Sequence, residues 1–175
     1  MFVESEILRS QNNYNDSNNI LFEILDRGVI NQQIYESIID NYLMMEDIDN
    51  TIQYSITAID HFKDSLPFLS VLTDCYIKEM DIEGMKTLLG TYNQSFLNEP
   101  LIYKKAEMLF MLSDWKALIA TYEDIAIRFY SEVNELDELI DRIIEIGNLT
   151  NNLQLSIISL MNISKTYPTH LTIKD

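Results

Sequence analysis

A helix-start pattern recurs along the chain at intervals of 33 to 34 residues. In this pattern an Asp or Asn precedes a large residue, which is followed by apolar residues at helical spacing. The large residues are Ile48, Ile82, Trp115 and Leu149, and one further step back reaches Tyr14. A period of this length is typical of two-helix units that stack on one another. The sequence therefore predicts a stack of helical hairpins.

The residue before each large residue belongs to a type that caps helix N-termini. These residues are Asn13, Asp47, Asp81, Asp114 and Asn148. Their side-chain oxygens accept hydrogen bonds from backbone N–H groups that have no partner in the first helical turn. We therefore interpret this column as structural, with each large residue beginning the second helix of its unit.

Apolar residues at a spacing of three to four predict ten helices in five antiparallel pairs. We expect an all-α fold, a right-handed α-solenoid in which residues 1–175 form one domain. The expected units lie near 1–30, 31–64, 65–97, 98–131 and 132–167. The expected helices lie near 2–11, 14–27, 31–45, 48–62, 65–79, 82–94, 99–112, 115–130, 134–146 and 150–166.

The scarcity and the positions of glycine and proline support a helical fold. The chain has only four Gly and three Pro, and sheet-rich folds need many tight turns made by such residues. Pro67 and Pro100 fall in expected first helical turns, where a missing N–H breaks no intrahelical bond. Gly147 suits the end of a helix.

The net charge of -16 restricts the partners. Lys and Arg supply most of the affinity for phosphate backbones and anionic lipids, so we expect no nucleic acid and no membrane insertion. The first residues, MFVESEILRS, carry acids where a secretory signal needs positive charge, so we expect a cytoplasmic protein. The acidity suits a basic protein segment as partner, or it maintains solubility.

The sequence contains no recognisable catalytic or metal-binding pattern. His61 and His170 are the only histidines, and with the single Cys75 they make no metal-ligand spacing. We expect Cys75 to be a buried, unreactive thiol, and we expect no enzymatic activity, cofactor or metal. Trp115 and Tyr122 invite a ligand-stacking role, but their repeat positions favour core packing.

The spacing and the large residues resemble the tetratricopeptide repeat (TPR). That family has an aromatic residue six positions before the large residue, a bulky one seven after it and a small one inside the first helix. The matching residues here are Tyr42, Tyr76, Leu89, Ala106 and Tyr122. The third unit matches best, and the small position holds a larger residue in the other units. The resemblance implies peptide or protein binding in a concave groove, without catalysis.

In that family the first helix of each pair lines the groove. Positions eight before the large residues are acidic in all four complete units, and positions three further on are apolar. With Tyr103, which joins the set from the third unit, the candidate partner-binding residues are Asp40, Leu43, Asp74, Ile77, Tyr103, Glu107, Phe110, Asp141 and Ile144. Stacked units would place a row of carboxylates beside a row of apolar side chains. Alternatively, the acids form a solvated face and the apolar residues belong to the core.

Two functions follow from these patterns. In the first, the chain is a protein–protein interaction module, adaptor or chaperone-like, whose acidic and apolar groove holds a strand or helix with Lys/Arg and apolar anchors. In the second, it is a structural subunit or a fragment of a larger assembly, which uses its convex face and ends. The last residues, SKTYPTHLTIKD, do not read as the long polar terminal helix that such stacks often use as a cap. This fits docking, continuation into a longer chain, or dimerisation.

Overall fold

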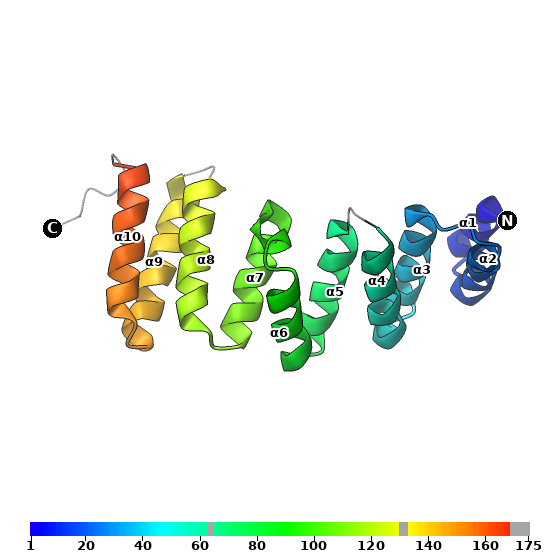
Figure 1. Ribbon diagram of the computed structural model, residues 1–175, viewed down its shortest axis with the longest axis horizontal. Helices are drawn as coiled ribbons and strands as arrows, with labels where there is room; N and C mark the ends of the chain where they lie inside the picture. The colour runs from blue at the N-terminus through cyan, green and yellow to red at the C-terminus, as the bar shows by residue number, and fades with distance from the viewer. Residues whose placement is uncertain (63–64, 130–132, 169–175) are drawn as a thin grey trace. The chain divides into compact units, whose positions relative to one another are not determined.

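The computed structural model describes residues 1–62, 65–129 and 133–168, and every regular element within them is a helix (Figure 1). The chain divides into two compact units, Met1–Glu79 and Met80–Asp175. The first unit contains α1 (Phe2–Ser10), α2 (Tyr14–Asp26), α3 (Gln32–Met44), α4 (Ile48–His61) and α5 (Leu66–Lys78). The second contains α6 (Ile82–Thr91), the 3₁₀ helix η1 (Ser95–Leu97), α7 (Glu99–Met111), α8 (Trp115–Arg128), α9 (Val133–Leu149) and α10 (Leu153–Thr166).

The all-α fold class predicted from the sequence is confirmed. Within the first unit each helix packs on the next one in sequence: α1 on α2, α2 on α3, α3 on α4, and α4 on α5. Within the second unit α7 packs on α8, while α9 and α10 pack on each other and on α8. The prediction of a single domain over 1–175 stays a prediction.

Each turn from a first to a second helix is built from one residue in the left-handed region. These residues are Asn12, Glu46, Met80, Ser113 and Asn151, with φ between 53° and 60°. The next residue is the N-cap of the following helix. At Asn13, Asp47, Asp114 and Asn152 its N–H donates to a carbonyl five residues back, as from Asp47 to Tyr42 (2.9 Å) and from Asp114 to Leu109 (3.0 Å). This is the bond that closes a Schellman turn, so one short segment ends one helix and begins the next.

Three of the five predicted caps accept the expected hydrogen bond. Asp47, Asp81 and Asp114 accept from the backbone N–H of Asn50, Gly84 and Ala117. Asn13 is the N-cap of α2, but its side chain accepts no cap hydrogen bond.

The predicted start of the last helix is wrong by one helical turn. Asn148 lies inside α9, and the N-cap of α10 is Asn152. The reason is the length of α9, which has 17 residues, whereas α3, α5 and α7 have 13 each. The extra turn moves the residue that begins the second helix of this pair from Leu149 to Leu153.

Gly147 is correspondingly not at a helix end but inside α9, where α10 approaches closely. A Cβ at this position would lie 2.8 Å from the Ser156 Cβ and would collide with the Ser156 hydroxyl. That hydroxyl donates to the backbone carbonyl of Ile143 (2.8 Å), so it cannot turn aside without losing a buried hydrogen bond. The glycine is therefore needed for the packing of α9 on α10.

Each unit has its own apolar core. In the first unit Leu21, Ile24, Ile34 and Ile38 are buried together, and the stacked rings of Phe22, Tyr54 and Tyr42 lie beside them. The core of the second unit is lined by α7, α8, α9 and α10, and its fully buried members include Ile102, Leu118, Leu136, Ile143 and Ile163. Cys75 is buried, as predicted.

We expect the substitution Asp114→Ala to lower the free energy of unfolding by about 1 kcal/mol, because it removes the acceptor for the Ala117 N–H. Asn148→Ala, at the predicted but incorrect cap position, should change it by less than about 0.5 kcal/mol. Urea unfolding followed by the emission of Trp115, the single tryptophan, measures both values. Equal losses in the two variants would contradict the corrected helix start.

Gly147→Ala should destabilise the protein by about 1–3 kcal/mol, because the added methyl group overpacks the contact with Ser156. Gly90 offers a matched control, since a Cβ there would meet nothing within 4 Å. Gly90→Ala should stabilise by about 0.5–1 kcal/mol through helix propensity alone. The same unfolding measurement compares them, and a stabilising Gly147→Ala would disprove the close approach.

Candidate functional site

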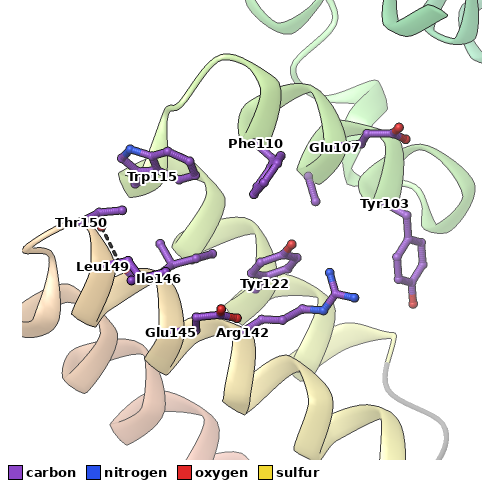
Figure 2. A pocket seen from close by; sticks show the side chains of 11 residues that line it. Tyr103, Glu107, Phe110, Trp115, Tyr122, Arg142, Glu145, Ile146, Leu149 and Thr150 are labelled. Carbon is purple, nitrogen blue, oxygen red and sulfur yellow. Dashed lines mark hydrogen bonds between the residues drawn. The ribbon is translucent and has the colours of Figure 1, made fainter.

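A hollow of about 970 Å³ opens on one side of the second unit, between α7, α8 and α9 (Figure 2). Side chains from α7 form one wall and side chains from α9 form the other. The lining consists of Tyr103, Ala106, Glu107, Phe110, Trp115, Tyr122, Arg142, Glu145, Ile146, Leu149 and Thr150. A concave site of this size with a few polar groups among apolar ones is typical of a ligand-binding position.

One end of this hollow is apolar. The rings of Phe110 and Trp115 meet edge to face, with centroids 5.7 Å apart at 81°. Phe110 is 57 % exposed and Leu149, on the opposite wall, is 77 % exposed. Covering exposed apolar side chains of this size lowers the free energy, so this end can bury an apolar side chain of a ligand.

A second, smaller hollow of about 350 Å³ adjoins the first. The two share Tyr103, Tyr122 and Arg142, and the smaller one adds Ile125, Glu135, Glu138 and Leu139. Because they share lining residues, the two hollows are described together as the α7–α9 groove, which has an apolar end at Trp115 and an acidic end at Glu135 and Glu138. Over its whole length α9 carries five acidic residues and one basic residue.

Tyr103 reports the negative potential at the acidic end. Burial raises the pKa of the Tyr103 hydroxyl above its ordinary value of 10.0, and the carboxylates of Glu135 and Glu99 raise it further. Each carboxylate opposes the formation of a third negative charge. The same potential would attract a Lys or Arg side chain of a ligand.

The structure brings three of the candidate residues of the second unit together. Tyr103, Glu107 and Phe110 line the groove. Asp141 and Ile144 are exposed on α9 but do not line it. The extra turn of α9 explains the difference, because the residue eight positions before Leu153 is Glu145, which is acidic and does line the groove.

The other four candidate residues belong to the first unit. Asp40 accepts a hydrogen bond from the Arg9 guanidinium at 2.8 Å, so this carboxylate already has a cationic partner. Leu43 and Asp74 are exposed, and Ile77 is half-buried. The participation of Asp40, Leu43, Asp74 and Ile77 in binding stays a prediction.

Sequence reasoning missed several residues of the groove. The repeat positions of Trp115 and Tyr122 predict core packing. Tyr122 is indeed only 8 % exposed, yet both side chains also line the groove. Arg142, Glu145, Ile146, Leu149 and Thr150 were missed because the register of the last pair was wrong by a turn. Counting eight positions back from Leu153, where α10 begins, instead of from Leu149 identifies Glu145.

His61 and Cys75, the one histidine and the one cysteine of the described residues, both belong to the first unit. Within residues 1–62, 65–129 and 133–168, no three His, Cys, Asp or Glu side chains are grouped so as to hold a metal ion. The His61 ring lies 5.7 Å from the ring of Tyr35, and Cys75 is buried. His170 lies outside the described residues. No helix of the described part is long and apolar enough to cross a lipid bilayer.

Comparison with solved structures found a likeness to a thermophilic TPR protein of Thermus thermophilus. The TM-score is 0.49 at 11 % sequence identity, over 97 % of this chain and 91 % of that chain. The scan against protein-family models found no match, and neither did the search of curated proteins.

We expect Glu135→Gln to lower the pKa of Tyr103, because one of the two carboxylates that oppose its ionisation becomes neutral. Glu107→Gln is the control, since the Glu107 carboxylate points away from the Tyr103 ring (Figure 2). The pKa is measured by NMR after selective labelling, from the pH dependence of the chemical shift of the Tyr103 ring carbon that bears the hydroxyl. An unchanged value in Glu135→Gln would remove Glu135 from the acidic end.

Proposed function

We propose that this chain is a non-catalytic, cytoplasmic protein-interaction module whose α7–α9 groove binds an extended or helical segment of a partner protein. The observation that carries the proposal is the combination, in one groove, of exposed aromatic and aliphatic side chains with a cluster of carboxylates. The matching ligand has an apolar anchor followed by Lys or Arg residues. An adaptor or a chaperone-like protein has this kind of task.

The apolar end supplies most of the binding free energy in this proposal. Phe110 and Leu149 are more than half exposed, and Trp115 is half-buried between them and the core. Fully burying one side chain of this kind is worth about 1.5–3 kcal/mol. Aromatic residues are also the ones on which binding energy concentrates in protein interfaces.

The acidic end selects the partner. Glu135 and Glu138 lie there, Glu107 and Glu145 lie along the walls, and Arg142 is the single cation among the lining residues. Each exposed ion pair with a ligand Lys or Arg contributes only about 0.2–1 kcal/mol. Such charges act mainly on the rate of association and on the rejection of acidic ligands.

Arg142 gives the groove a further element of selection. Its side chain extends from α9 toward Tyr122 and Tyr103, in the part that both hollows share (Figure 2). A guanidinium at this position repels a cation placed midway along the groove. The basic residues of the ligand therefore belong near Glu135 and Glu138, and its middle should be neutral.

Titration of the protein with designed peptides tests the proposal. A peptide with an aromatic anchor and two or three Lys residues should change the emission of Trp115, because Trp115 lines the apolar end and is the only tryptophan. The same peptide with Glu in place of Lys should bind at least tenfold more weakly. If no member of a varied set of such peptides alters the emission, the proposal fails.

Two variants locate the binding site. Phe110→Ser removes an apolar wall and should weaken peptide binding about tenfold or more, equivalent to about 1.4 kcal/mol. Ile56→Ser is the matched control, since Ile56 is a 41 % exposed apolar residue of α4 in the first unit. Equal affinity of Phe110→Ser and the unmodified protein would place the binding elsewhere.

A further inference from the structure

One face of α10 exposes a stripe of large apolar side chains. Leu153, Ile157, Ile158 and Met161 are each between 48 % and 57 % exposed. Leu153, Ile157 and Met161 are spaced by four residues, so they follow one another along one face of the helix. These four residues are called here the α10 stripe.

The stripe is not the result of a loosely attached helix. The opposite face of α10 buries Ser156, Ser159 and Ile163. The Ser159 hydroxyl and the Asn162 amide donate to the two oxygens of Glu123 on α8, at 2.6 Å and 2.8 Å. These bonds and the Ser156 bond to α9 fix the rotation of α10, so the apolar face is held outward.

The charge of α10 sets it apart from the rest of this acidic chain. It contains no Asp or Glu, whereas every other α-helix of the described residues contains at least one. Its one charged residue is Lys165, in its last turn. A basic partner would find no carboxylate on this helix, so the kind of ligand proposed for the α7–α9 groove does not fit the stripe.

We infer that the α10 stripe is a self-association surface, on which α10 of a second copy packs about a two-fold axis. Two copies with a net charge of -16 each repel one another wherever their carboxylates face each other, and α10, alone among the described α-helices, carries no carboxylate. A two-fold contact uses the same patch on both copies, so the stripe covers its own counterpart. Side chains spaced by four residues form ridges that pack into the grooves of an identical helix.

Molar mass by light scattering over a range of concentrations tests the inference. The unmodified chain should reach twice the mass of one copy, and Ile157→Glu with Met161→Glu should restore the mass of a single copy with unchanged helical circular dichroism. Ile56→Glu introduces the same charge on a similarly exposed apolar residue of α4 and should leave the doubled mass intact. A single-copy mass of the unmodified chain at several hundred micromolar would overturn the inference.

A cysteine at the centre of the stripe gives a second, independent test. In a two-fold contact the middle of the stripe faces its own counterpart, so Ile157→Cys should form a disulfide-linked dimer on mild oxidation. Cys75 is the only other cysteine and is buried, and Ile56→Cys is the exposed control that should stay unlinked. No excess of linked dimer in Ile157→Cys over this control would refute the α10 contact. Phe110→Ser should leave the doubled mass unchanged, which separates this surface from the groove.

Discussion

The architecture depends on how each helical hairpin reverses the chain. A residue in the left-handed region comes directly before the N-cap of the next helix, so the end of one helix and the start of the next share a single turn. At Glu46, Met80 and Ser113 the left-handed residue is not glycine, and such a conformation costs about 1–2 kcal/mol. The hydrogen bond accepted by the following Asp returns about 1 kcal/mol of this. The cap and the strained residue therefore act as one device, which recurs with the period of the sequence.

The groove uses side chains that the fold also needs. Tyr122 belongs to the core of the second unit and exposes only a small part of its surface, yet that part lies where the two hollows meet. Trp115 begins α8, packs partly against the core and turns its remaining surface toward Phe110. Because these rings are held by packing on one side, they meet a ligand without losing further rotamer freedom.

Much of the fold could be predicted from the sequence, because the turn device leaves a trace in residue types. Asp47, Asp81 and Asp114 fixed the starts of three helices correctly. The last pair failed for a physical reason: four added residues amount to about one turn, so the apolar pattern of α9 continues unchanged. Asn148 and Asn152 are both of a residue type that favours the N-cap position, and sequence alone could not choose between them. The same shift hid Glu145 and Leu149, while Tyr103, Glu107 and Phe110 were found because α7 keeps the common length.

The additional turn of α9 also has a consequence for how such a chain can change. It lengthens the helix by about 6 Å on the side where Leu149 stands opposite Phe110, and the caps and the left-handed residue simply move along with it. Insertions of three or four residues at this point keep the inward face of the helix inward, whereas one or two would rotate it out of the core. The wall that α9 gives to the α7–α9 groove can thus change in length by one helical turn at a time while the hairpin remains intact. The shape of the groove can therefore change during evolution without a change of fold.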